Sequence, residues 1–204
     1  MSKTIFITGS TDGIGKLAAL KLAKAGHEVI LHGRNPEKLA AVVNTIKTET
    51  GNAGISNYVA DLTDLSKVKI MAEKVRADHP KIDVLINNAG VFLSGSPRDD
   101  KGMDIRFVVN YLAPILLTQE LLPVLASGDE TRVINLSSAA QIPVSLSALR
   151  GEQALADQVA YAQSKLAFTM WNSAMAEQHQ GLTFIAVNPG SLLNTKMVQE
   201  AYGK

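Results

Sequence analysis

TIFITGSTDGIG, residues 4–15, is the stretch that decides the fold of this chain. Apolar residues lead up to Thr8, and glycines then stand at positions 9, 13 and 15, directly before a segment with helical spacing. Glycines in a turn between a strand and a helix let the backbone approach a phosphate, and the helix N-terminus presents free N–H groups to the same anion. The stretch therefore predicts a strand over residues 4–8, a helix over residues 14–25 and an anion-binding turn between them.

The turn by itself allows two other interpretations. Glycines also serve an ordinary strand-to-helix connection that needs positive φ, so the turn alone does not prove a ligand site. The pair Gly15-Lys16 suggests the phosphate loop of nucleoside triphosphatases, but that motif needs glycine at position 10 and Ser or Thr at position 17. The chain has Ser10 and Leu17 there, which excludes the nucleoside triphosphate interpretation.

The composition is that of a single globular domain over residues 1–204, with 46% hydrophobic and 19% charged residues. The net charge is +1 and the charges are interspersed, which argues against a nucleic-acid or polybasic membrane partner. There is no cysteine, and the four histidines lack metal-ligand spacing, so no metal site is predicted. No apolar run approaches the ~20 residues of a membrane span, and no signal-peptide core precedes the first strand. We therefore expect a cytoplasmic protein that acts on small molecules.

Short β-rich runs alternate with helical patterns along the whole chain, without a linker between them. This alternation is typical of an α/β fold with a doubly wound, mostly parallel sheet and helices on both faces. Most of the runs are continuously apolar, as a sheet covered on both faces requires. The expected strands are residues 4–8, 28–32, 55–60, 84–87, 132–136 and 183–187.

The carboxyl ends of these strands define the expected ligand crevice, because doubly wound sheets bind ligands there. The helix after the second strand has a clear start, with Asn35 as cap and Pro36 at its first position. The residues that follow the six strands are candidates for the crevice, namely Gly9, Arg34, Asp61, Asn88, Ser138 and Pro189.

Seven motifs occur in a fixed order along the chain: TGSTDGIG (8–15), Asp61, NNAG (87–90), Asn110, NLSS (135–138), YAQSK (161–165), and NPG (188–190) with a later Thr195. In order and spacing they resemble the short-chain dehydrogenase/reductase family over residues 3 to 197. One residue between Gly13 and Gly15 is typical of the short reductases rather than of the extended nucleotide-sugar epimerases. The run GMDIRFVVNYLAP (102–114) and the long segment before Tyr161 resemble the retinol-dehydrogenase-like and carbonyl-reductase-like branch.

Tyr161 and Lys165 are the central catalytic candidates. They share one face of a helix, and an ammonium beside a phenol lowers the pKa of the phenol from about 10. The phenol can then protonate a carbonyl oxygen while hydride arrives from a nicotinamide, and can accept the alcohol proton in the reverse direction. The resemblance implies that Ser138 orients the substrate oxygen and that Asn110 holds a water against Lys165. Asn110 also has the simpler interpretation of a polar residue on a buried helix, and Ser137 is expected to be structural.

The resemblance also implies the cofactor contacts. They are Gly9, Ser10, Thr11, Gly13, Ile14, Gly15, Arg34, Asn35, Asp61, Leu62, Asn88, Ala89, Gly90, Tyr161, Lys165, Pro189, Gly190 and Thr195. Asp61 would accept a hydrogen bond from the adenine amino group, although Asp61 or Asp64 could instead cap the next helix. Asn87 is expected to brace strands.

The end of the second strand indicates which dinucleotide binds. An acidic residue there would hold the ribose 2′-OH of NAD, whereas this chain has Gly33 and Arg34. A guanidinium can grip a phosphate in a planar fork, so NADP(H) is the preferred cofactor and NAD(H) the alternative. Asp12 argues in the other direction, because many NADP-preferring relatives have a basic residue at that position. Lys16 or His32 are candidates to compensate, and the alternative is that each is a solvated surface group.

Two further segments bear on the substrate and on assembly. The residues between Ser138 and Tyr161 include several apolar ones that could wall an apolar substrate pocket, or else form an irregular excursion packed by its own side chains. The stretches 107–119 and 166–178 carry a single charge, Glu177, so they predict helices buried on more than one side. The resemblance implies that they form a homodimer interface, and the alternative is that the segment 139–160 covers them.

The resemblance implies a substrate-covering helix and a seventh strand beyond residue 204, so we expect residues 1–204 to lack the final strand. Either the chain is an abbreviated member or it continues past Lys204. The predicted function is hydride transfer between NADP(H) and a small carbonyl or alcohol substrate. The alternatives are a non-catalytic dinucleotide-sensing or interaction protein, and an epimerase or dehydratase with tightly held NAD, which Gly33 and Arg34 disfavour.

Overall fold

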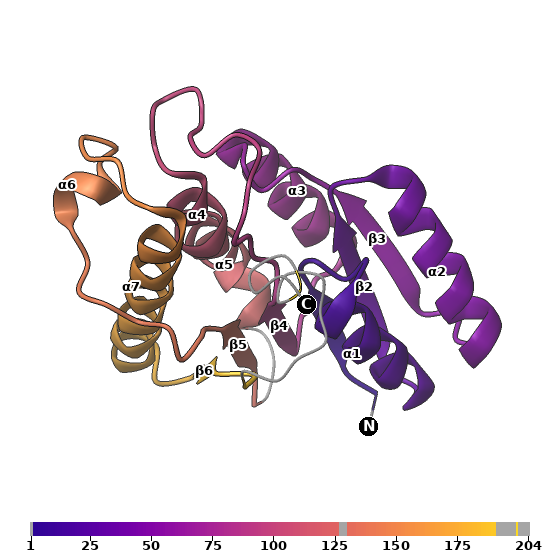
Figure 1. Cartoon of the computed structure of the whole chain (residues 1–204). Coiled ribbons are helices and arrows are strands. Elements are labelled where there is room, and N and C mark those ends of the chain that lie inside the picture. The colour runs from indigo at the N-terminus through magenta and orange to yellow at the C-terminus, as the bar shows by residue number, and fades with distance from the viewer. Residues whose placement is uncertain (1, 127–129, 191–198, 200–204) are drawn as a thin grey trace.

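Six parallel strands form one sheet in this computed structural model, which describes residues 2–126, 130–190 and 199 (Figure 1). The spatial order is β3 (Ile55–Val59), β2 (Glu28–Gly33), β1 (Thr4–Ile7), β4 (Val84–Asn87), β5 (Arg132–Leu136) and β6 (Thr183–Val187). Every predicted strand agrees with the observed one to within one residue at each end. The direction of winding reverses between β1 and β4, the position where doubly wound sheets bind dinucleotides. The predicted fold class is therefore confirmed.

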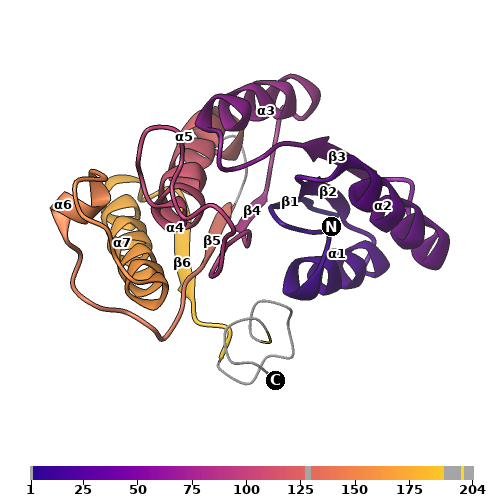
Figure 2. The same ribbon diagram turned by 45° about the horizontal axis from the view of Figure 1, so that its top comes forward.

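Helices lie on both faces of the sheet (Figures 1 and 2). On one face are α1 (Gly13–Lys24) and α2 (Pro36–Thr50). On the other are α3 (Leu65–Asp78), α5 (Ala113–Leu125) and α7 (Asp157–Gln178). A short helix α4 (Ile105–Phe107) and a π-helical turn η1 (Val108–Leu112) lead into α5, and α6 (Leu146–Leu149) lies between β5 and α7.

The two helices next to β2 begin at side-chain caps. The Asp12 carboxylate accepts a hydrogen bond of 2.7 Å from Gly13 N–H, so α1 starts one residue earlier than predicted. Asn35 Oδ1 accepts one of 2.8 Å from Lys38 N–H, directly before Pro36, as the sequence predicts. Such caps satisfy N–H groups that have no partner within the helix. Asp12 is thus a structural residue of the helix start.

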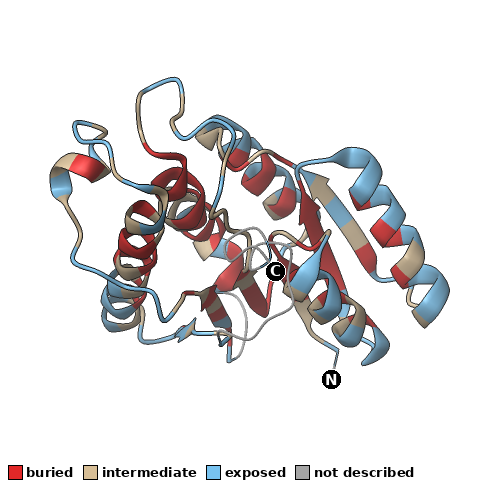
Figure 3. Ribbon diagram, viewed as in Figure 1, coloured by how far each residue is buried: buried red, intermediate tan, exposed pale blue. Residues whose placement is uncertain are grey.

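The two faces of the sheet differ in how far their helices extend. Phe6 and Val133, on β1 and β5, are fully buried beneath α3, α5 and α7. On the opposite face, α1 and α2 pack over β1 to β3. There Ile7 is fully buried, whereas Ile185 on β6 is 36% exposed. Figure 3 shows this buried core in red along the strands and on the inner sides of the helices.

Judged by length and composition alone, the continuous helical stretch over residues 105–125 is long and apolar enough to cross a membrane. More than half of its most apolar window is buried, and the stretch packs against α3 and α7. The prediction that no apolar run approaches the length of a membrane span is therefore wrong by length and composition, although more than half of the most apolar window lies inside the fold.

Candidate active site

The glycine-rich turn after β1 depends on close backbone contacts. Gly9 has φ of 65°, and a Cβ there would lie 2.9 Å from the Cα of Ala89. A Cβ on Gly15 would overlap the carbonyl oxygen of Gly9 and would lie 2.5 Å from Asn88 Nδ2. The turn, the start of α1 and the segment after β4 therefore meet at a distance that only glycine allows.

Hydrogen bonds from two neighbouring strands hold this turn. Asn88 Nδ2 donates to the carbonyl oxygens of Thr8 and Gly9 at 2.8 and 3.0 Å. The Ser10 hydroxyl, which is fully buried, accepts from His32 N–H at 2.9 Å and donates to His32 O at 3.1 Å. Ser10 thus braces the turn against β2 with its side chain. Thr11, Gly13 and Ile14, by contrast, are exposed or half-buried.

The end of β2 carries an exposed basic residue. Arg34 is exposed beside the α2 cap Asn35, and the two residues that end the strand and follow it, Gly33 and Arg34, are not acidic. Lys16 is also exposed, so it stays a candidate for phosphate contact. His32 is 2% exposed, and burial lowers its pKa to about 4. The prediction that His32 could compensate as a phosphate-binding cation is therefore wrong, because its ring is neutral and enclosed.

Two aspartates follow β3, and Asp64 rather than Asp61 caps the next helix. Asp64 is the cap of α3, since its Oδ1 accepts from Ser66 N–H at 3.0 Å. Asp61 Oδ1 accepts from Thr63 N–H at 3.0 Å, and its Oδ2 has no hydrogen-bond partner in the part of the chain that the structure describes. Leu62 is buried in the core, so its side chain is not available to a ligand.

Tyr161 and Lys165 lie on one face of α7, as predicted. Lys165 Nζ is 5.7 Å from the centroid of the Tyr161 ring and donates a hydrogen bond of 2.7 Å to the carbonyl oxygen of Leu136, at the end of β5. Lys165 is 4% exposed, and burial lowers its pKa to about 8. The Tyr161 ring is half-buried and packs edge-on against Phe92, with 5.0 Å between the centroids.

Asn110 lies in the π-helical turn and connects two segments of the site. Its Oδ1 accepts from Val91 N–H at 2.8 Å, and its Nδ2 donates to Val91 O and to Ser164 Oγ at 2.9 and 3.1 Å. Ser164 Oγ in turn donates to Tyr161 O at 2.7 Å. These three hydrogen bonds of the side chain join the segment after β4 to α7.

The sequence analysis did not predict this π-helical turn, although the sequence contains a signal for it. Pro114 follows Asn110 by four residues and has no N–H to donate to the Asn110 carbonyl oxygen. Proline also clashes with the carbonyl four residues before it, which favours a kink or a wider turn at this position. Such wider turns occur frequently at functional sites.

Two polar pairs confirm their predicted structural roles. Ser137 is buried, and its Oγ shares a hydrogen bond of 2.6 Å with Thr169 Oγ1. Asn87 Nδ2 donates to Asn135 Oδ1 at 2.8 Å and thus braces β4 against β5. Ser138, which follows Ser137, is half-buried at the end of β5, where its Oγ accepts from Ala140 N–H at 3.1 Å.

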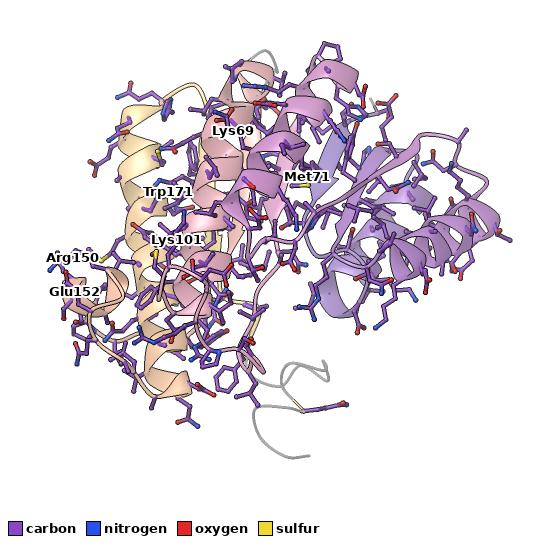
Figure 4. The ribbon with its side chains drawn as sticks, turned by 90° about the horizontal axis from the view of Figure 1, so that it is seen from above. Lys69, Met71, Lys101, Arg150, Glu152 and Trp171 are labelled. Carbon is purple, nitrogen blue, oxygen red and sulfur yellow. The ribbon has the colours of Figure 1, made fainter. Side chains whose placement is uncertain are left out.

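The segment between Ser138 and α7 is a largely irregular loop that hydrogen bonds attach to α7 and to the segment after β4. Gln163 Oε1 accepts from Ser145 N–H at 3.0 Å, and Arg98 donates to Gly151 O at 2.9 Å from the segment after β4. Leu146 is 64% exposed. At the outer edge of this excursion Arg150 and Glu152 form an ion pair of 2.9 Å (Figure 4).

The helix faces predicted to form an interface are only partly exposed. Phe168 is 2% exposed and stacks on Trp171, with 5.7 Å between the centroids, whereas Met170 is 60% exposed.

Pro189 is half-buried and Gly190 has φ of 90° in the turn after β6. The predicted nicotinamide contact Thr195 lies outside the described residues.

Comparisons with known proteins agree with this geometry. A family model described as short chain dehydrogenase matches residues 3–204. Retinol dehydrogenase 13 from Mus musculus is 36% identical over 193 residues, which are 92% of this chain and 58% of that protein. Polyprenol dehydrogenase from Homo sapiens is 32% identical over 210 residues, which are 98% of this chain and 63% of that protein. The chain thus spans about three fifths of the length of these curated relatives.

Solved structures match nearly the whole chain. A short chain dehydrogenase from Shigella flexneri complexed with NADP has a TM-score of 0.81 at 30% identity, covering 99% of this chain and 82% of that one. A short chain dehydrogenase from Escherichia coli CFT073 complexed with NADPH has a TM-score of 0.81 at 31% identity, with the same coverage. Both neighbours therefore bind the phosphorylated nicotinamide dinucleotide on the same fold.

Proposed function

The chain belongs to the short-chain dehydrogenase family and to its retinol-dehydrogenase-like branch, and from this premise we propose that it transfers hydride between NADP(H) and a small carbonyl or alcohol substrate. The observation that carries the proposal is the buried Lys165 ammonium, 5.7 Å from the Tyr161 ring centroid at the carboxyl end of the sheet. In this function Tyr161 is the general acid/base.

The proton chemistry follows from the charge on Lys165. At a pH below its pKa of about 8 the lysine is protonated. A positive charge near a phenol favours the phenolate. Tyr161 then gives its proton to the substrate oxygen during reduction and takes it back during oxidation. The bound cofactor supplies or accepts the hydride. Ser138, on the half-buried end of β5, is proposed to donate a hydrogen bond to the same substrate oxygen.

The preference for NADP(H) over NAD(H) rests on Arg34. Its exposed guanidinium follows β2 where an acidic residue would bind the 2′-OH of NAD, and the residues present fit a 2′-phosphate. The NADP and NADPH complexes of the two structural neighbours support this choice. NAD(H) remains the alternative cofactor. We also keep a cytoplasmic location, a homodimer and an apolar substrate as predictions.

A fluorescence titration of the full chain with NADPH, and in parallel with NADH, tests the proposal first. We expect NADPH to bind more tightly than NADH, and carbonyl compounds to cause oxidation of NADPH by the wild-type chain. Binding of both cofactors without turnover of any carbonyl would favour a dinucleotide-sensing protein. No binding of either would overturn the proposed function.

A further inference from the structure

His32 is a buried residue of the crevice that the proposed chemistry does not use, yet both of its ring nitrogens are engaged. Its Nδ1 accepts a hydrogen bond from Gly9 N–H at 3.1 Å, and its Nε2 lies 3.1 Å from the carbonyl oxygen of Ala60. Gly9 belongs to the glycine-rich turn, and Ala60 directly precedes Asp61. One imidazole therefore joins two segments from which cofactor contacts are predicted.

These partners fix the tautomer of the ring. A backbone N–H only donates, so Nδ1 of His32 is unprotonated, and a carbonyl oxygen only accepts, so Nε2 carries the hydrogen. Burial, which lowers the pKa to about 4, keeps the ring in this neutral form, and the hydrogen bond to the Ala60 carbonyl oxygen and then the Asp61 carboxylate oppose that effect only in part. A protonated ring would direct an N–H at the Gly9 N–H, so the charged form is incompatible with this turn.

The backbone of His32 completes the link to the turn. Its carbonyl oxygen accepts from Ser10 N–H at 2.9 Å, and its N–H donates to Ser10 Oγ at 2.9 Å. The amides of Gly9 and Ser10 are thus used inside the protein. In the described part of this turn, no acceptor within the protein is recorded for the amides of Thr11, Asp12, Ile14 and Gly15, which leaves them free for an anion.

We propose that His32 is a positioning residue for the dinucleotide: its neutral ring holds the glycine-rich turn at a fixed place relative to the Asp61 segment, so that one cofactor meets both. This inference rests on the proposed dinucleotide binding. The pyrophosphate would lie at the turn and the adenosine near Asp61, so an error in the relative position of the two segments would weaken binding although His32, enclosed in the protein, would not touch the cofactor.

Two isosteric substitutions separate the two hydrogen bonds. His32→Asn places an amide oxygen near the position of Nδ1 and keeps the acceptor for Gly9, while His32→Gln places an amide nitrogen near Nε2 and keeps the donor for Ala60. His32→Leu removes both bonds while keeping an apolar side chain in the site. The matched control is His27→Leu, because His27 Nδ1 also accepts a backbone N–H, from Lys3 at 3.3 Å, at the opposite end of β2.

The measurements are the dissociation constant of NADPH for each full-length variant and its unfolding midpoint without cofactor. We expect His32→Leu to weaken NADPH binding by about tenfold or more, as the loss of buried hydrogen bonds predicts. His32→Asn is expected to recover most of the lost affinity, because the Gly9 bond fixes the turn, and His32→Gln less. The control His27→Leu lowers the unfolding midpoint and leaves NADPH binding unchanged.

Nitrogen-15 NMR of the wild-type ring provides a test that does not depend on the variants folding. An unprotonated Nδ1 and a protonated Nε2 at pH 6 agree with the inference, whereas a charged ring or the opposite tautomer overturns it. Wild-type affinity for NADPH in both His32→Asn and His32→Leu also overturns it, with the proposed function intact. If the wild-type chain binds neither NADPH nor NADH, the proposed function fails as well.

Discussion

The two halves of the sheet build their parts of the crevice in different ways. In the half that contains β1, β2 and β3, the critical positions are backbone: Gly9 and Gly15 stand where no Cβ fits, and Ser10 and His32 use their polar atoms within the protein. In the half that contains β5 and α7, the predicted chemistry belongs to the side chains of Tyr161 and Lys165. The first half is therefore intolerant of added atoms, and the second of altered functional groups.

The halves also differ in how they are covered. The Ile7 position on β1 is fully buried beneath α1, whereas Ile185 on β6, on the same face, is 36% exposed. Both halves are buried on the opposite face, where Phe6 and Phe184 are 0% and 9% exposed. Substitutions in the first half thus affect binding and stability together, while those at Tyr161 are expected to affect turnover alone.

Tyr161→Phe gives the largest expected effect and isolates the catalytic half. Removing the hydroxyl removes the proposed acid/base, so turnover should fall by roughly 10²- to 10⁴-fold. The ring and its packing on Phe92 stay, so NADPH affinity should change little. Steady-state rates and a NADPH titration of the same preparation measure both quantities. A variant that kept wild-type turnover would remove Tyr161 from the mechanism.

Lys165 predicts a pH dependence of stability in the same half. Burial lowers its folded pKa to about 8 from 10.5, so between these values the unfolded chain binds more protons and stability rises with pH. The shift corresponds to about 3 kcal/mol of unfolding free energy gained from below pH 8 to above pH 10.5. Urea unfolding of wild type and Lys165→Met across this range should show the gain in the wild type only. Parallel curves would contradict the assignment.

Gly15→Ala tests the backbone character of the cofactor half. The new Cβ would overlap the Gly9 carbonyl oxygen, and the overpacking should cost about 2 kcal/mol of stability and weaken NADPH binding. Gly181→Ala is the matched control, since a Cβ there meets no atom within 4 Å. Unfolding free energies and NADPH titrations compare the two. Equal behaviour of both variants would show that the close approach at Gly15 is not required.

Arg34→Ala has the smallest expected effect and sharpens the cofactor assignment. Loss of one charge-assisted contact to the 2′-phosphate should weaken NADPH binding by about tenfold or more and leave NADH binding nearly unchanged. The ratio of the two dissociation constants is the measurement, and Lys16→Ala in parallel tests the other exposed cation of this crevice edge. An unchanged ratio in Arg34→Ala would assign the selectivity elsewhere.

Local patterns predicted much of this architecture. Short apolar, β-rich runs located all six strands to within one residue, and the strand ends predicted a ligand crevice, because a parallel sheet brings its carboxyl ends to one edge. The spacing of Tyr161 and Lys165 placed both on one helix face. The cap at Asn35 was predicted because its side-chain oxygen acts within three residues.

Features that depend on distant contacts were not predictable in this way. The sequence left open whether Asp61 or Asp64 caps α3, and only the fold shows Asp64 in that position. It offered His32 as a phosphate-binding cation, and the fold buries it between Gly9 and Ala60 as a neutral bridge.

The sequence by itself determined the strand and helix pattern, the glycine-rich turn and the residues at the strand ends, because each depends on nearest neighbours and on periodicity. Only the tertiary structure decided which polar groups are hydrogen-bonded within the protein and which are left for a ligand. Hydrogen bonds such as His32 to Gly9 join residues 23 positions apart. Burial, and with it the protonation of His32 and Lys165, exists only once the strands and α7 have packed.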